Sequence, residues 1–254
     1  MMNNIFDTHA HYDDDRFADC LDAVLSENAQ NGVVGIINCA VDYASAERLR
    51  ALAEQYDFCH FAAGVHPENI PSHSVDTEPL YPLLQHKKAV AVGEIGLDYH
   101  WEDCAPKEVQ KEWFCAQLKV ANELDLPAII HDRDAHADTL EILRKYRPKG
   151  VLHCFSGSAE MAREITDLGL YIGLGGVVTF KNARKALEVA AAVPMDRLLL
   201  ETDAPYMAPE PFRGKTNLSH YIAYVAKAIG EARGMEAQAV LDACRENARR
   251  LFGV

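Results

Sequence analysis

The chain contains 254 residues, and 49% of them are hydrophobic, which is enough to build the core of one large α/β domain. Its formal net charge of -13 excludes a broad positively charged surface of the kind that binds duplex DNA, so a phosphate substrate has to be held by local cations. The N-terminal segment lacks the features of a signal peptide, no apolar run is long enough to span a membrane, and seven scattered cysteines favour a reducing cytoplasm.

Eight short runs rich in apolar and β-branched residues are predicted to be strands. In chain order they read NNIFDTH, VVGIINCA, CHFAAGVH, AVAVGEIGL, LPAIIH, GVLHCFS, LYIGLGGV and DRLLLETD. Helical periodicity occupies intervals between them, over residues 18–31, 44–55, 108–124, 135–146, 159–168 and 183–192. The interval 70–86 is a weaker helix candidate because prolines interrupt it, and residues 220–252 predict two closing helices separated at Gly234.

The alternation of apolar strands with amphipathic helices predicts a parallel sheet that is covered by helices. Eight such units in a chain of about 250 residues fit a TIM barrel, a (β/α)8 fold in which residues 1–254 form a single domain. The alternative is an open doubly wound sheet. We predict the barrel, because no GxGxxG motif follows the first strand and the GLGG at residues 173–176 comes too late for a dinucleotide-binding turn.

Four histidines lie where predicted strands end. His9 and His11 are two residues apart at the end of the first strand, and an extended backbone directs such a pair to the same side. His131 and His153 close two later strands, at the end of a barrel where active sites are found. A single histidine at such a position is more often structural, but the recurrence of imidazoles at strand ends favours metal ligation.

Two carboxylates occur in the same kind of position. Glu94 lies inside an otherwise apolar strand, and Asp203 ends the eighth run just before Pro205. A buried carboxylate without a partner costs several kcal/mol, so each of them requires a salt bridge or a bound cation. Together with the four histidines they form a mixed nitrogen and oxygen set that suits two divalent metal ions and is compatible with Mg, Mn or Zn.

Local cations and one further imidazole follow the same strand ends, and these residues are candidates for binding substrate phosphate. They are His66, Arg133, Arg213 and Lys215. The alternative interpretation is that the charged ones are solvated loop residues and that the histidine caps a turn.

Glu201 lies two residues before Asp203, so on an extended strand it is expected to point the same way and to orient a metal ligand. A structural ion pair is the alternative role for it. Aromatic residues also gather in the predicted loops, where they either stack on an unpaired base or pack the loops themselves. These residues are Tyr99, His100, Trp101, Tyr206 and Phe212.

Seven segments, in chain order DTHAH, GVHPE, GEIGLDY, PAIIHDRDA, HCFSGS, GLGGVVTF and ETDAPYMAP, resemble the signature segments of the TatD family of metal-dependent deoxyribonucleases. The resemblance covers nearly the whole chain. It implies a TIM-barrel metallohydrolase of the amidohydrolase-like group with nucleic acid, in particular DNA, as its substrate. It also implies that His9, His11 and Asp203 hold one ion, that His131 and His153 hold the other, and that Glu94 bridges the two.

The sequence departs from the family pattern after Arg213-Gly214-Lys215. The family often continues with an Asn-Glu-Pro segment, whereas this chain continues with residues 216–219, Thr-Asn-Leu-Ser. The contacts that the usual glutamate makes are therefore not expected here. The ligand positions themselves show no substitution.

Two metal ions that activate water and stabilise a departing alkoxide suit the hydrolysis of phosphodiester bonds. Asp203 is expected to bind an ion and to accept a proton from the attacking water, and the bridging Glu94 is the second catalytic residue. The alternatives are a barrel hydrolase of another ester, an amide or a lactone, for example of an aminoacyl ester on tRNA, and a non-catalytic metal-binding barrel. Glu94 stands where some barrel relatives carry a carbamylated lysine, which disfavours that group.

Overall fold

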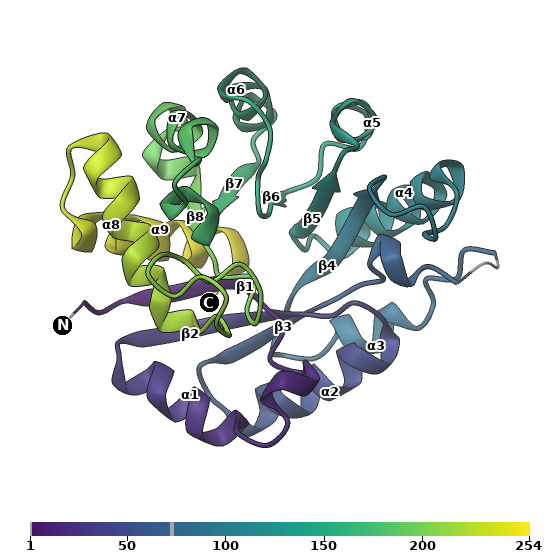
Figure 1. Ribbon diagram of the computed structural model, residues 1–254. Helices are drawn as coiled ribbons and strands as arrows, with labels where there is room; N and C mark the ends of the chain where they lie inside the picture. The colour runs from purple at the N-terminus through teal and green to yellow at the C-terminus, as the bar shows by residue number, and fades with distance from the viewer. Residues whose placement is uncertain (1, 72–73) are drawn as a thin grey trace.

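The computed structural model describes residues 2–71 and 74–254, and its eight strands are hydrogen-bonded side by side in chain order (Figure 1). The strands are β1 (Ile5–Ala10), β2 (Val33–Cys39), β3 (Cys59–Ala63), β4 (Ala89–Asp98), β5 (Ala128–Arg133), β6 (Gly150–Leu152), β7 (Tyr171–Leu174) and β8 (Leu198–Leu200). Every neighbouring pair from β1–β2 to β7–β8 is parallel. Strands paired strictly in chain order are those of the predicted barrel and not of a doubly wound sheet.

Helices connect the strands and lie outside the sheet (Figure 1). They are α1 (Leu21–Gln30), α2 (Tyr43–Gln55), α3 (Leu80–Leu84), α4 (Lys107–Glu123), α5 (His136–Tyr146), α6 (Ala159–Asp167), α7 (Arg184–Ala192), α8 (Ile222–Arg233) and α9 (Ala237–Phe252). The weak interval 70–86 contains the short α3, and its residues 72–73 lie outside the described residues. Among the described residues, no helix combines the length and the apolar character needed to cross a membrane.

Local sequence signals explain where several helices begin and end. The Asp42 side chain accepts a hydrogen bond from the Ser45 N–H at the start of α2, and Ser158 caps α6 in the same way. Gly234 has a φ of 66° and ends α8 in the left-handed region that glycine adopts without strain. The predicted separation of the two closing helices at Gly234 is therefore confirmed.

The segment that follows β8 closes the barrel against β1. Ala204 forms a parallel bridge with Ala10, and the Ala204 carbonyl accepts a hydrogen bond of 2.7 Å from the His11 N–H. The Asp203 N–H donates to the His9 carbonyl at 2.9 Å. The turn after β8 is thus hydrogen-bonded directly to His9 and His11, the first two predicted ligands.

Two apolar clusters fill the structure. The larger cluster lies between the sheet and its helices and includes Leu49 of α2 and Phe114 of α4. The smaller one takes residues from every strand, including Phe6, Ile129 and Tyr171, and therefore occupies the inside of the barrel. Phe252 at the end of α9 packs on this interior cluster, so the last helix covers the end at which the strands begin.

Candidate metal centre

The predicted ligands lie together at the opposite end of the barrel, where the strands end. They are His9, His11, Glu94, His131, His153 and Asp203. They come from five strands or the short segments that follow them, namely β1, β4, β5, β6 and β8. Residues that are far apart in the sequence therefore meet at one point of the fold, as the strand-end pattern predicted.

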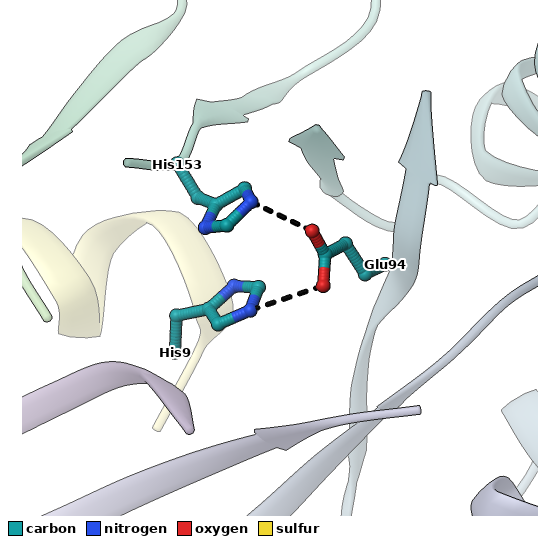
Figure 2. A group of neighbouring side chains, drawn as sticks. All are labelled: His9, Glu94 and His153. Carbon is teal, nitrogen blue, oxygen red and sulfur yellow. Dashed lines mark ion pairs between the residues drawn. The ribbon is translucent and has the colours of Figure 1, made fainter. Parts of the chain in front are cut away.

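Glu94 lies at the centre of this group and is only 2% exposed. Its Oε2 atom is 3.2 Å from His9 Nε2 and 3.6 Å from His11 Nε2. Its Oε1 atom is 2.6 Å from His153 Nε2 and 2.9 Å from His131 Nδ1. Figure 2 shows His9 and His153 facing different oxygens of this one carboxylate. Glu94 is thus placed between two sets of imidazoles.

Asp203 completes the side of the group that contains His9 and His11. Its Oδ1 atom is 3.4 Å from His11 Nε2 and 3.7 Å from His9 Nε2. The expectation that Asp203 ends an extended strand is wrong, because β8 ends at Leu200 and Asp203 has a φ of 59°, in the left-handed region. A turn that is hydrogen-bonded to β1, and not the strand itself, carries this carboxylate into the group.

Two of the histidine rings are oriented by acceptors behind them. His11 Nδ1 lies 2.8 Å from the Cys39 carbonyl, and His131 Nε2 lies 2.9 Å from Asp98 Oδ2. A ring nitrogen that donates to an oxygen leaves the other nitrogen with its lone pair, and this is how proteins prepare histidines as metal ligands. Asp98 was missed by the sequence analysis, although it follows Glu94 by four residues on the same strand and alternation places both on one face.

His66, which was predicted to contact the substrate, lies next to Glu94 in this group. Its Nε2 atom is 3.4 Å from Glu94 Oε1, and the residue is 7% exposed. The Glu68 N–H donates to His66 Nδ1 at 3.2 Å. Burial lowers the pKa of His66 and favours the neutral ring, so the proton resides on Nε2. His66 is therefore arranged as a hydrogen-bond donor toward the centre.

Glu201 is buried beside His153, on the side of the ring that faces away from Glu94. Its Oε1 atom accepts a hydrogen bond from the Cys154 N–H and lies 3.8 Å from His153 Nδ1. Gly173 makes room for it, because a Cβ there would lie 2.4 Å from Glu201 Oε2. Burial raises the pKa of Glu201 to about 8. The expected extended strand does not continue to this residue, yet Glu201 still lies beside one predicted ligand.

Burial and the close contacts between imidazoles and carboxylates shift the pKa values of this group. Burial by itself raises the pKa of Glu94, but the surrounding charges, first His153 and His9, hold it well below its usual range. Burial likewise disfavours charge on the rings and lowers the pKa of His9 to about 4. For His11 and His131, hydrogen bonds with carboxylates outweigh burial and raise the pKa to about 9 and about 10. The buried carboxylates therefore require positive charge close by.

The donor atoms fit divalent metal ions. Within the described residues, His9, His11 and Asp203 bring their ligand atoms within 4.8 Å of one another, and so do His9, Glu94 and His153, and His66, Glu94 and His131. Imidazole nitrogens and carboxylate oxygens are the ligands of choice for such ions. A divalent ion supplies the required positive charge without protonated rings, because metal binding releases ligand protons.

A cavity of about 700 Å³ opens above the group and has a strongly acidic wall. Asp13, Asp15 and Glu68 contribute to it. Its arginines are Arg48, which pairs with Asp13 at 2.8 Å, and the predicted Arg133. Electrostatic attraction for phosphate is thus limited to few positions, as the net charge of the chain indicated.

Arg213 and Lys215 do not contribute to the lining of this cavity. The Arg213 guanidinium lies 3.6 Å from the centre of the Phe180 ring, and the Lys215 ammonium lies 5.9 Å from that of Phe212. Their predicted role in binding substrate phosphate stays a prediction, and any such contact would lie outside the lining of this cavity. No local sequence pattern predicted that these two side chains lie over aromatic rings.

A buried polar network ties β1 to the residues after this loop. Asp7 accepts hydrogen bonds from Thr202 Oγ1 at 2.6 Å and from Ser219 Oγ at 2.7 Å. Asn217 donates to the carbonyls of Thr202 and Tyr206, each at 2.8 Å. The segment 216–219, in which the chain departs from the usual family pattern, thus fixes the turn that carries Asp203.

Known proteins are similar to this chain over nearly its whole length. Residues 6–253 match the family model described as TatD related DNase. YabD of Bacillus subtilis, by name an uncharacterized metal-dependent hydrolase, is 42% identical over 98% of this chain and 99% of its own length. The 3'-5' ssDNA/RNA exonuclease TatD of Klebsiella pneumoniae is 34% identical over 98% of both chains.

The structural comparison extends the likeness to the whole fold. The crystal structure of YjjV, a TatD homologue from Escherichia coli K12, matches with a TM-score of 0.93 and 38% identity over 100% of both chains. A phosphotriesterase homology protein from Escherichia coli, 16% identical, shares the fold with a TM-score of 0.71. The family model and these relatives match nearly the whole chain, and the barrel carries the predicted ligands at one end. The chain therefore belongs to the TatD family and is a metal-dependent hydrolase.

Proposed function

We propose that this protein hydrolyses phosphodiester bonds in nucleic acid with two divalent metal ions bound at the centre. The observation that supports the number of ions is the position of Glu94 between two sets of imidazoles, with one carboxylate oxygen toward each set. His9, His11 and Asp203 would hold the first ion, and His131 and His153 would hold the second, with Glu94 shared. The cytoplasmic location that the cysteine pattern favours stays a prediction.

When bound, such ions lower the pKa of a water molecule, polarise a phosphoryl oxygen and stabilise the leaving alkoxide. The protein's own residues perform the remaining tasks. Burial raises the pKa of Asp203, but its hydrogen bond with His11 outweighs that and holds the carboxyl below its usual range. Asp203 is therefore ionised at neutral pH, and we assign to it the acceptance of the proton from the attacking water.

Substrate binding is assigned to the residues above the ligand group. His66 directs Nε2–H toward the centre and can donate to a phosphoryl oxygen. Arg133 lies in the cavity wall and offers a charged donor for phosphate. Glu201, beside His153, is proposed to hold that ring in position.

The substrate proposal rests on the Klebsiella relative that is named a 3'-5' ssDNA/RNA exonuclease and matches over nearly the full chain. The test is hydrolysis of end-labelled single-stranded DNA, duplex DNA and RNA, after EDTA treatment and with Zn, Mn or Mg restored in turn. We expect cleavage of single strands that EDTA abolishes and a divalent metal restores. Cleavage of lactones or N-acyl compounds in parallel assays, without cleavage of any phosphodiester, would overturn the proposal.

Replacement of Asp203 tests the proton transfer. Asp203→Asn keeps the shape of the side chain but cannot accept a proton, so we expect kcat on single-stranded DNA to fall by about 10²- to 10⁴-fold. Metal content, measured by atomic spectroscopy, separates a loss of the base from a loss of the ion. The control is Asp15→Asn, which removes a carboxylate from the cavity wall but not from the ligand group. Near-normal turnover of Asp203→Asn with metal bound would refute the assigned role.

A further inference from the structure

Exposed aromatic side chains gather around the cavity above the metal centre. Trp101 is 48% exposed and Tyr206 is 42% exposed, and both line the cavity. The neighbouring Met207, also exposed, lines it too. Large apolar side chains are normally exposed singly, so their concentration at one opening suggests a binding surface.

The two aromatic residues lie on opposite sides of this opening. Trp101 follows β4 and Tyr206 follows β8, and strands paired in chain order around a barrel place β4 and β8 across from each other. The ligand group lies between them, since Glu94 belongs to β4 and Asp203 precedes Tyr206 by three residues. A molecule that touches both rings therefore passes over the metal centre.

Each ring is held by a neighbouring arginine. The Arg133 guanidinium lies 5.1 Å from the centre of the Trp101 ring, and the Arg16 guanidinium lies 4.6 Å from that of Tyr206. The Tyr206 hydroxyl also donates to Asp14 Oδ2 at 2.9 Å. The arginine covers one face of each ring, and the large exposed fraction leaves area for a second planar partner.

The side chains at the rim of the opening add little attraction for phosphate to that of the proposed metal ions. Asp13, Asp14, Asp15 and Glu68 line the same cavity and repel a polyanion. An uncharged part of a nucleic acid must then contribute, and that part is the flat face of a base. Stacking of an unpaired base on an aromatic side chain is favourable for every base, whereas in a duplex the bases are already paired and stacked.

We infer that Trp101 and Tyr206 are two base-stacking platforms on opposite sides of the metal centre. They hold the bases that flank the scissile phosphodiester of an unpaired strand. The inference rests on the proposed function and adds the residues that select single strands. It also predicts a weak dependence of KM on salt for a short strand, because few basic side chains line the cavity.

The test compares substrates with and without the bases in question. One short single-stranded DNA carries normal bases at the two positions flanking the cleaved bond, and its matched analogue is abasic at both. For the normal strand we expect Trp101→Ala and Tyr206→Ala each to raise KM by about tenfold, the range of one stacked base. For the abasic strand we expect the same KM in these variants as in the wild type, because the base that would stack on the ring is already absent.

Conservative variants and a matched control separate stacking from a structural role. Trp101→Phe and Tyr206→Phe retain an aromatic face and should keep most of the affinity for the normal strand. The control is Tyr224→Ala, which removes an aromatic side chain of 39% exposure from α8, outside the lining of this cavity. An equal loss on normal and abasic strands, or no loss on either, would overturn the inference.

A binding measurement keeps the inference separate from the proposed reaction. The metal-free protein in EDTA is titrated with the same two strands while tryptophan fluorescence is followed. Trp101 is exposed and Trp113 is buried, so the response to stacking comes from Trp101. We expect quenching by the normal strand and much weaker quenching by the abasic one. If the wild type binds in this way but cleaves no phosphodiester, the proposed function fails and the platforms stand. Equal quenching by both strands rejects the platforms even if cleavage occurs.

Discussion

The two ends of the barrel differ in what they contain. From the inside of the barrel down to the end where the strands begin, apolar side chains from all strands form one cluster, and Phe252 of α9 packs on it. At the end where the strands end, five imidazoles, Asp203 and Glu94 share a small volume under an acidic cavity. One end of the barrel is therefore closed by apolar packing, while the candidate chemistry lies at the other, where the TIM barrel places the loops that follow its strands.

The largest effect is expected from Glu94→Gln, which alters only the reactive end. The neutral amide cannot be shared between two cations, so we expect kcat on single-stranded DNA to fall by about a thousandfold or more, the equivalent of several kcal/mol of metal assistance. Bound metal should fall in the same preparation. Circular dichroism should show an intact barrel, because the interior cluster of the other end is unchanged.

The matched control for Glu94→Gln is Glu68→Gln. It removes the same charge from the cavity wall but from outside the ligand group. We expect its kcat to change by less than about tenfold, because water and salt screen an exposed charge. Similar losses in the two variants would mean that cavity charge, and not the shared carboxylate, governs activity.

The complementary variant alters only the closed end. Phe252 is 6% exposed within the interior cluster, and Phe252→Ala leaves a cavity there. We expect the free energy of unfolding to fall by about 3 kcal/mol, measured by urea denaturation, with unchanged kcat at 25 °C. Arg249→Ala on the same helix should alter stability by less than about 0.5 kcal/mol, because its pair with Glu246 is exposed. A loss of activity in folded Phe252→Ala protein would contradict the division between the two ends.

A smaller effect at the reactive end is expected from Asp98, which holds His131 from behind. Asp98→Asn should weaken metal binding by about 10- to 100-fold, the usual cost of losing such a partner, as measured by competition with a chelator. The control is Asp134→Asn, since Asp134 pairs with the exposed His100 and not with a ligand. Unchanged metal affinity in Asp98→Asn would show that Glu94 alone is sufficient to orient the His131 ring.

The reactive end was predictable from the sequence to the extent that it depends on strand ends. Apolar runs that contain or precede His9, Glu94, His131 and His153 identify positions that any parallel barrel brings to one edge. The same reasoning failed at Asp203, where a left-handed turn replaces the expected strand. Asp203 nevertheless lies beside the other predicted ligands, because the turn is hydrogen-bonded to β1. No local sequence pattern reveals that pairing.

Contacts between distant segments account for what the sequence analysis missed. Asp7 lies in an apolar run, and its partner Ser219 is 212 residues away, so their hydrogen bond has no local signature. Asp98 was overlooked although alternation on β4 points to it. Arg213 and Lys215 were predicted to bind phosphate because they follow the last strand, but their charged groups lie over aromatic rings and outside the cavity lining.

The smallest effect is expected from replacing Arg213 and Lys215, and it should depend on the length of the substrate. Because neither side chain lines the cavity, the double variant Arg213→Ala/Lys215→Ala should leave KM for a tetranucleotide within about twofold, like other exposed charges. A strand of about 20 nucleotides can extend onto the loop after β8, where each lost phosphate contact lowers the slope of log KM against log salt by about 0.7. Arg249→Ala/Arg250→Ala removes the same charge at the closed end and should leave that slope unchanged. An unchanged slope in both double variants would mean that the substrate never crosses this loop.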